Sequence, residues 1–388
     1  MAASAALCLA VAACDGGSAD PPRASQPPVP TTTENPDEMP QVIVDGARFV
    51  DKDGRTVQLR GVNVHSLEPA VYERAHEMGA NLIRVTVPWD QFEPAAPVGG
   101  VRTWDESRLE ALDQLVDYCR QYDIQVLLDL HQYGWSPYFS HLQSGGRANG
   151  IPGWFYTGRR FQPTDEGRKL AQARFYGDAR GIELYSGFAA MLAERYLESP
   201  NVLGYEILNE PPTGVMPRKP WVAKRVLRWQ GQIREAILRV DPVRTVFFMV
   251  PPRVDLRKVD LSPLGRPGGL AFDFHDYYAG TGERGRTTLQ GGDYEGTAFA
   301  QGAHLEPAVG AAKGWGVPMI VGEWGVFADT VGADVYQRQM VALFESVGAG
   351  WARWSLDRRE RLSLLGPDGR LNSAGIQLRE LISAAAER

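Results

Sequence analysis

The chain has 388 residues and a formal net charge of −6 at pH 7, with 44% hydrophobic and 23% charged residues. This composition is typical of a folded globular protein, and the acidic balance argues against nucleic acid as a partner. The three cysteines, Cys8, Cys14 and Cys119, are too few for a disulfide framework or a cysteine-based zinc site.

Residues 1–14 have the pattern of an export signal. Met1 to Ala13 is a short apolar run that ends in small residues and is too short to cross a bilayer as a helix. The run Val11-Ala12-Ala13-Cys14 resembles the lipobox of bacterial lipoproteins, in which the signal is cut before a lipid-bearing cysteine. The resemblance implies a cell-surface lipoprotein of a bacterium, lipidated at Cys14. A plain secretory signal and a secreted protein are the alternative.

Residues 15–40 are predicted to be a disordered tether. The segment is rich in Pro, Ser, Thr, Asp and Glu and offers almost nothing to bury. A tether of this kind would hold residues 41–388 clear of a membrane that the protein contacts only through its lipid anchor.

Residues 41–388 alternate strand-length apolar runs with amphipathic helical segments, as β/α units do. Eight strands are predicted, at Leu59 to Val64, Asn81 to Val87, Gln125 to Leu130, Val202 to Leu208, Thr245 to Val250, Leu270 to Phe274, Pro318 to Val321 and Gly350 to Ser355. Six helices are predicted, at Glu106 to Gln121, Leu184 to Leu197, Trp221 to Val240, Phe299 to Trp315, Val335 to Val347 and Ala374 to Ala385.

This order predicts an α/β fold, a single (β/α)8 TIM barrel. Val42 to Val57 carries two Asp-Gly turn signals and is predicted to form a small hairpin at the barrel bottom. Active sites of such barrels lie at the carboxyl ends of the strands. Those ends are polar or aromatic here, and they include His65, Arg84, His131, Asn209, Glu210, His275, Tyr277, Glu323, Trp324 and Trp354.

Two glutamates stand directly after apolar strands, Glu210 after the fourth and Glu323 after the seventh. A pair of carboxylates without a metal-ligand cluster beside it is typical of enzymes that hydrolyse glycosides. Taken alone, each glutamate could also be a solvated charge on the rim of the barrel.

The motifs around these glutamates resemble those of glycoside hydrolase family 5, a cellulase-like group of retaining barrels. The resemblance spans Arg60 to Trp354 and is carried by Asn81-Leu82-Ile83-Arg84, Leu128-Asp129-Leu130-His131, Ile207-Leu208-Asn209-Glu210-Pro211, His275-Asp276-Tyr277, Gly322-Glu323-Trp324-Gly325 and Trp351-Ala352-Arg353-Trp354-Ser355.

The resemblance implies a retaining mechanism, with Glu210 as acid/base, Glu323 as nucleophile and the two carboxyl groups about 5 to 5.5 Å apart. Arg84 and Tyr277 would then donate hydrogen bonds to Glu323 and hold its pKa low. The other substrate-binding residues would be Asn209 at the sugar 2-hydroxyl, His131 and His275 as orienting groups, and Trp354 beneath the sugar. His65 and Trp324 are weaker candidates for the same role.

Other chemistries find less support in the chain. The six histidines never pair at metal spacing, and neither a metalloprotease nor a serine-esterase motif is present. Gly280 to Gly285 matches a dinucleotide-binding fingerprint but lacks the helix that should follow it. We therefore expect no metal, no cofactor and a monomer. A catalytically silent carbohydrate-binding barrel is the alternative of another class.

The substrate is suggested by a segment of about 50 residues between the third strand and its helix, far longer than a usual βα loop. Its His-Gln start resembles the endoglycoceramidase branch of family 5, although Tyr133 stands where that branch usually carries Asp. This resemblance implies a glycolipid, or another β-glycoside with a hydrophobic aglycone. An endo-β-1,4-glucanase or a mannanase is the alternative.

The segment carries six aromatic residues whose role the sequence leaves open: Trp135, Tyr138, Phe139, Trp154, Phe155 and Tyr156. They fit an apolar channel for a lipid, stacking platforms for sugars, or the core of a folded loop.

Overall fold

The computed structural model describes residues 41–142, 148–217, 219–252, 254–277, 279–281, 287–289, 294, 298–358 and 361–387. The predicted signal, tether and lipidation site at Cys14 lie outside these residues, as does most of the Gly280 to Gly285 fingerprint. Among the described residues, no helix is both long enough and apolar enough to span a membrane.

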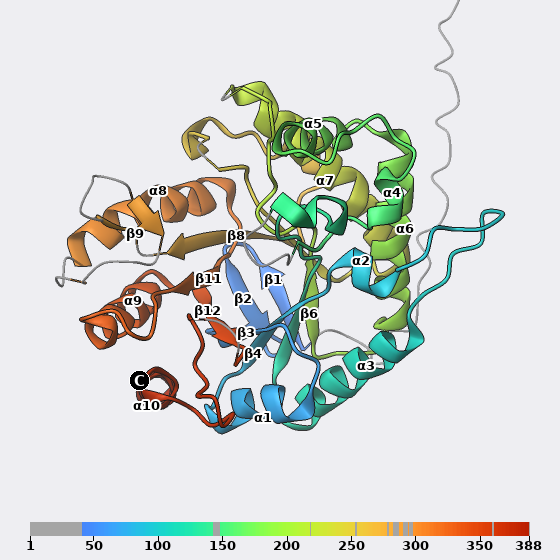
Figure 1. The fold of residues 1–388 in the computed structure, drawn as a ribbon. Helices are drawn as coiled ribbons and strands as arrows, with labels where there is room; N and C mark the ends of the chain where they lie inside the picture. Colours follow the sequence, from blue (N-terminus) through green and yellow to red (C-terminus); the bar gives the residue numbers. More distant parts are fainter. Residues whose placement is uncertain are drawn as a thin grey trace, which may run out of the picture. The chain divides into compact units, whose positions relative to one another are not determined.

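Eight parallel strands close into a barrel in the order β11-β12-β3-β4-β5-β6-β7-β8 (Figure 1). Their bounds are β3 Arg60–Val64, β4 Leu82–Thr86, β5 Gln125–Asp129, β6 Val202–Glu206, β7 Thr245–Phe248, β8 Leu270–Tyr277, β11 Met319–Gly325 and β12 Gly350–Leu356. All eight predicted strands and the TIM barrel are therefore confirmed.

Helices surround the barrel, and each of the six predicted ones is present. The helices are α1 Pro69–Glu77, α2 Trp89–Phe92, α3 Glu106–Gln121, α4 Gly153–Tyr156, α5 Asp165–Phe175, α6 Ala179–Arg195, α7 Pro220–Val240, α8 Ala298–Trp315, α9 Ala333–Val347 and α10 Ser373–Ala386. Short 3-10 helices lie at Pro137–Leu142, Leu256–Lys258 and Ser262–Leu264. The last two are the helical turns of the described β7–β8 connection, where the sequence predicts no helix.

Two hairpins accompany the barrel. Strands β1 Val42–Asp45 and β2 Arg48–Asp51 form the predicted one, while β9 Ala279–Thr281 pairs antiparallel with β10 Thr287–Leu289. Phe49 of the first hairpin stacks on Phe247 of β7 at a centroid distance of 5.9 Å. Such burial of a large apolar side chain contributes about 1.5 to 3 kcal/mol. The hairpin thereby joins the lower layer of the barrel interior.

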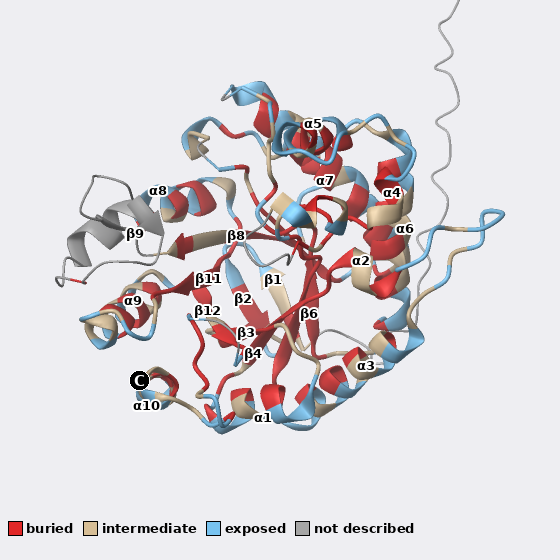
Figure 2. Cartoon of the chain, in the orientation of Figure 1, coloured by how far each residue is buried: buried red, intermediate tan, exposed pale blue. Residues whose placement is uncertain are grey.

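The barrel has an apolar lower layer and a polar upper layer. The lower layer is formed by inward side chains of the strands and hairpin: Val42, Phe49, Leu59, Leu82, Leu127, Leu203, Phe247, Ala271, Ile320 and Ala352. The strands are buried along almost their whole length, with the helices covering their outer faces (Figure 2). Polar side chains that point inward above the lower layer are therefore held in a packed frame.

Candidate active site

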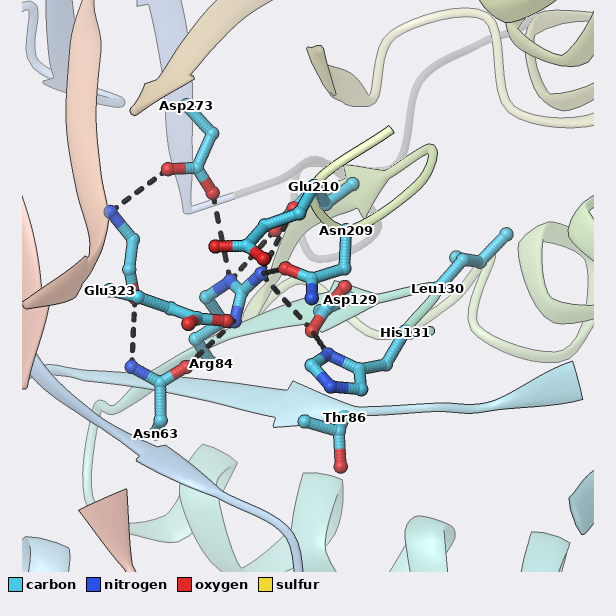
Figure 3. A network of polar contacts seen from close by, with 12 residues as sticks. Asn63, Arg84, Thr86, Asp129, Leu130, His131, Asn209, Glu210, Asp273 and Glu323 are labelled. Atoms are coloured by element: carbon cyan, nitrogen blue, oxygen red, sulfur yellow. Dashed lines mark hydrogen bonds and ion pairs between the residues drawn. The ribbon is translucent and has the colours of Figure 1, made fainter. Parts of the chain in front are cut away.

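Arg84, at the centre of β4, organises the upper layer. Its guanidinium is fully buried and lies among Asp129, Asn209 and Glu323 (Figure 3). It makes two hydrogen bonds to Glu206, from Nε at 2.7 Å and from Nη2 at 2.9 Å. It also donates to Glu323 Oε1 at 3.0 Å, and it lies 3.1 Å from Asp129. Burial alone would lower the pKa of Arg84, but the charges of the surrounding carboxylates raise it well above its usual value. The arginine is therefore a fixed cation.

Glu323 lies near the end of β11 with a nearly buried carboxylate. Besides Arg84, the Tyr277 hydroxyl donates to its Oε2 at 2.8 Å, and both of these predicted hydrogen bonds are thus present. The expected low pKa is wrong. Burial raises the pKa of Glu323, and the charges of His275 and Arg84 offset only part of that effect. Desolvation dominates because only 6% of the side chain is exposed.

Glu210 follows β6 and differs from Glu323 in its exposure, with 52% of its side chain accessible. Its backbone has a φ of 38°, in the left-handed region that few residues other than glycine adopt. The side-chain amide of Gln132 donates to the Glu210 carbonyl at 3.3 Å, and the Glu210 amide donates to Met249 Sδ at 3.1 Å. These contacts hold the backbone in a conformation that presents the carboxylate at the barrel mouth.

His275 of β8 lies between the two glutamates. Its Nδ1 is 3.0 Å from Glu210 Oε1 and 3.5 Å from Glu323 Oε2. Burial would lower the pKa of His275, but the charges of Glu323 and the hydrogen bond to Glu210 raise it to about 9. The hydrogen bond from His275 and the charges of His275 and Arg84 more than offset burial at Glu210 and lower the pKa of that carboxyl. At neutral pH the histidine therefore holds a proton beside both carboxylates.

One oxygen of Glu210 and one of Glu323 lie within 4.8 Å of each other. Carboxyl groups about 5 to 5.5 Å apart are typical of retaining glycosidases, whereas inverting enzymes keep about 6.5 to 9.5 Å for a water molecule. The oxygens of Glu210 and Glu323 thus lie close together, as the expected retaining arrangement requires, and the retaining mechanism stays a prediction.

One side of the mouth carries an aromatic and imidazole cluster. The His131 ring stacks on Trp354 at 5.8 Å, and His65 meets the edge of Trp354 at 4.3 Å. His131 Nδ1 lies 2.6 Å from Asp129, yet burial lowers the pKa of His131 to about 4, so the ring is neutral at pH 7. Asn209 Oδ1 accepts from Arg84 at 3.0 Å and its Nδ2 donates to the Gln132 carbonyl at 3.1 Å. These contacts fix the Asn209 amide beside Glu210.

A family model described as cellulase, glycosyl hydrolase family 5, matches residues 50–360. The chain belongs to glycosyl hydrolase family 5. The predicted family is therefore confirmed.

Curated relatives match parts of the chain. Endoglycoceramidase I of Rhodococcus hoagii is 31% identical over 189 residues, covering 43% of this chain and 36% of the relative. Endoglucanase N of Pectobacterium atrosepticum is 23% identical over 368 residues, covering 89% of this chain and 66% of the relative. The chain thus matches about a third of the length of the first relative.

Solved structures share the fold. An endogalactoceramidase has a TM-score of 0.71 at 21% identity, with 89% of this chain and 85% of that chain covered. Endo-glycoceramidase II from Rhodococcus sp., in complex with ganglioside GM3, has a TM-score of 0.68 at 22% identity, with 86% and 81% covered.

Trp324 does not line the barrel mouth, so the prediction that it contacts the substrate is wrong. The side chain is fully buried on the outside of the barrel and packs against Phe344 of α9 at 5.3 Å and Trp351 at 5.7 Å. The structure brings the other predicted residues of the folded part together at the barrel mouth.

Sequence reasoning missed four buried polar residues that support the site: Asn63, Asp129, Glu206 and Asp273. All are at most 1% exposed and all contact Arg84. Their signal in the sequence is a polar residue inside an otherwise apolar strand, because burying such a group is costly unless a partner is present.

The described residues of the long segment after β5 form a folded unit. It contains a 3-10 helix, α4 and α5, and four of its six aromatic residues, Trp135, Phe139, Phe155 and Tyr156, are at most 4% exposed. Trp135 donates to the Tyr156 hydroxyl at 2.7 Å and Trp154 donates to the Glu93 carbonyl at 2.8 Å. Of the three roles left open, the structure supports a folded core for this family 5 member.

Three groups of side chains in the described part of the chain bring possible metal-ligand atoms within 4.8 Å. They are Asp129, His131 and Glu323; Glu206, Asp273 and His275; and Glu210, His275 and Glu323. The carboxylates of these groups already face Arg84 or a histidine ring. The absence of a metal or cofactor from the working enzyme stays a prediction.

Proposed function

We propose that this family 5 enzyme is a retaining β-glycosidase with Glu323 as the nucleophile and Glu210 as the acid/base. The observation that carries the proposal is the contrast between the two carboxylates. Glu323 is buried and held by Arg84 and Tyr277, whereas Glu210 is half exposed, and their oxygens approach within 4.8 Å. A nucleophile needs a fixed position, and an acid/base needs access to the leaving oxygen and to water.

In the first step Glu323 attacks the anomeric carbon, the glycosidic C–O bond breaks, and a proton from Glu210 goes to the leaving oxygen. The Glu210–His275 pair carries one proton between its two members, because the pKa of His275 is raised to about 9 and that of Glu210 is lowered. In the second step Glu210 takes a proton from water, whose oxygen displaces Glu323 and releases the sugar.

The sugar next to the scissile bond would lie on the indole of Trp354, with Asn209, His131 and His65 around it. Asn209 already uses Oδ1 and one N–H in the protein, so its second N–H is available for the sugar 2-hydroxyl. Such a contact strengthens as positive charge develops on the sugar ring in the transition state.

We propose a β-glycoside with a hydrophobic aglycone as the substrate. Glu210 protonates the leaving oxygen, so the residues that follow it border the leaving-group side. In that segment Val215 and Trp221 have exposed fractions of 53% and 49%, so both offer apolar surface to an aglycone. The likeness to an endoglycoceramidase of Rhodococcus hoagii supports the same substrate class.

Cleavage of a β-1,4-glucan or a mannan is the second candidate. Endoglucanase N of Pectobacterium atrosepticum matches 89% of the chain, and Tyr133, two residues after His131, has 56% of its surface exposed. Two backbone hydrogen bonds to Asn149 hold the Tyr133 backbone. An exposed ring on a fixed backbone is a suitable stacking platform for a sugar chain.

The test is hydrolysis of lactosylceramide, glucosylceramide, carboxymethylcellulose and mannan, with Glu323→Gln as the blank. Release of intact sugar from the ceramides alone supports the hydrophobic-aglycone proposal. Activity on the polymers alone contradicts it and favours the glucanase or mannanase. Inactivity on all four substrates would favour the silent carbohydrate-binding barrel.

We also propose that the enzyme is exported and anchored through a lipid on Cys14. The support is the lipobox-like run Val11-Ala12-Ala13-Cys14. Labelling of the full-length chain with a radioactive fatty acid, and its loss in Cys14→Ala, is the expected result. Equal labelling of both proteins would contradict the anchor, and secretion of an unlabelled protein would support the plain signal.

A further inference from the structure

Just before Glu323, strand β11 has one more residue than the neighbouring strands β8 and β12. Against β8, Val321 pairs with Phe274 and Glu323 with His275, so Gly322 has no partner. Against β12, Val321 pairs with Trp351 and Trp324 with Arg353, which again leaves one residue of β11 over. The strand therefore carries a β-bulge at the residue before Glu323.

The bulge decides which way Glu323 points. Ile320 packs in the barrel interior and Val321 in the core outside it. Strict alternation would put Gly322 inside and Glu323 outside. Instead Glu323 meets Arg84 inside the barrel, and Trp324 packs outward against α9. The one additional residue thus makes the Glu323 carboxylate point toward the active site.

Two buried side chains, Asp273 and Asn63, bind the backbone of the bulge from opposite sides of the chain (Figure 3). Asp273 of β8 accepts a hydrogen bond from the Gly322 amide at 2.9 Å. Asn63 of β3 donates to the Gly322 carbonyl at 2.8 Å and to the Ala352 carbonyl at 3.0 Å. These side chains supply hydrogen bonds to Gly322, the residue that has no partner in the strand pairing.

The site around the bulge accepts only glycine. A Cβ atom on Gly322 would lie 2.2 Å from Asp273 Oδ2 and 2.4 Å from Oδ1. Both Asp273 and Asn63 are at most 1% exposed, so neither has room to withdraw. Asn63 also accepts from Arg84 Nη1 at 2.8 Å, which links the bulge to the cation that holds the Glu323 carboxylate.

We propose that Asp273 and Asn63 are positioning residues that hold the Gly322 bulge and thereby aim Glu323 at the anomeric carbon. The inference rests on the proposed role of Glu323 as the nucleophile. Neither residue touches the substrate in this proposal; each acts through the backbone that leads to Glu323.

The two oxygens of the Asp273 carboxyl group have different neighbours. Burial and the adjacent Glu206 carboxylate raise the pKa of Asp273 well above its usual value. Oδ1 accepts from the Gly322 amide, and Oδ2 lies 3.6 Å from Arg84 Nε. An asparagine has the same shape, and its side-chain oxygen can still accept from the Gly322 amide.

The test measures covalent labelling by a dinitrophenyl β-lactoside fluorinated at the carbon next to the anomeric centre, which traps the glycosyl-enzyme. Mass spectrometry of the wild-type protein identifies the labelled residue. The inactivation rate, corrected for the folded fraction, is then compared among Asp273→Ala, Asp273→Asn and Asn63→Asp. Asp241→Ala is the matched control, because Asp241 is an equally buried acid paired with Arg244 at 2.7 Å, before β7 begins.

We expect Asp273→Ala and Asn63→Asp to label at least about 100-fold more slowly, because a displacement of about 1 Å can cost that much. Asp273→Asn should recover most of the loss. The affinity for lactose should stay within about twofold in every variant, since the sugar contacts are not changed. Asn63→Asp keeps the volume and the acceptor for Arg84, so it tests the proposal even if Asp273→Ala does not fold; its rate is taken at its own pH optimum.

Labelling of wild-type Glu323 together with undiminished rates in Asn63→Asp or folded Asp273→Ala would overturn the positioning role. A rate for Asp273→Asn as low as that of Asp273→Ala would also overturn it. Labelling of a residue other than Glu323 in the wild-type enzyme would instead contradict the proposed function.

Discussion

The imidazole Nδ1 of His275 lies 3.0 Å from Glu210 Oε1, so one proton serves two titrating groups. The Glu323 carboxylate is 3.5 Å from the same nitrogen and contributes to the raised pKa of the histidine. The charge state of the proposed acid/base is therefore set by a neighbour on another strand.

The alkaline limb of the pH profile should report this pair. The pKa of His275 is raised to about 9, so kcat/KM should fall as the pH rises through about 9 and the pair loses its proton. In His275→Gln the alkaline limb should move to lower pH, because Glu210 must then hold the proton alone. His76→Gln, at an exposed position of α1, is the control and should leave the profile unchanged. An alkaline limb at the same pH in His275→Gln would contradict the shared proton.

Removing the carboxylate at Glu210 should separate the two chemical steps. Glu210→Ala should slow hydrolysis of glycosides with poor leaving groups by about 100- to 10,000-fold, because no acid remains to protonate the leaving oxygen. A dinitrophenyl glycoside needs no such proton, so its first step should be spared. Azide should restore turnover by replacing water in the second step. The absence of a glycosyl azide product would count against Glu210 as the acid/base.

Trp221 should contribute to binding only when the aglycone is hydrophobic. Burial of a large apolar side chain is worth about 1.5 to 3 kcal/mol, so Trp221→Ala should raise KM for glucosylceramide by about 10- to 100-fold. The KM for a dinitrophenyl glucoside should stay the same. Ile376→Ala removes an exposed apolar residue from α10 and is the control. If both substrates were affected equally, Trp221 would not lie in an aglycone site.

Trp324 of β11 and Trp354 of β12 should give opposite results when each is replaced by alanine. Trp324→Ala should lower the free energy of unfolding by about 3 to 5 kcal/mol, because it empties a packed site between β11 and α9. Trp354→Ala should change that free energy much less and raise KM, because its ring is partly exposed beside His65 and His131. Chemical denaturation and steady-state kinetics of both variants check the contrast. A raised KM with unchanged stability in Trp324→Ala would contradict its place in the core.

The long segment after β5 illustrates where pattern reasoning ends. Its aromatic residues are visible in the sequence, but a channel, a sugar platform and a core all use the same residue types. The hydrogen bond from Trp135 to Tyr156 and the burial of both side chains depend on how α4 and α5 pack. The exposed apolar residues in the segment after Glu210 are instead Val215 and Trp221, which have no distinctive pattern in the sequence.

The sequence by itself determined the barrel and most of the rim. Each apolar run of strand length became a strand, and because parallel strands deliver their carboxyl ends to one face, Arg84, His131, Asn209, Glu210 and Glu323 had to converge there. Only the tertiary structure decided the direction of individual side chains and their charge. Trp324 faces outward and Glu323 inward because of a one-residue bulge that depends on Asp273 and Asn63. The pKa of Glu323 is raised because burial, which no local pattern specifies, outweighs the charges of Arg84 and His275.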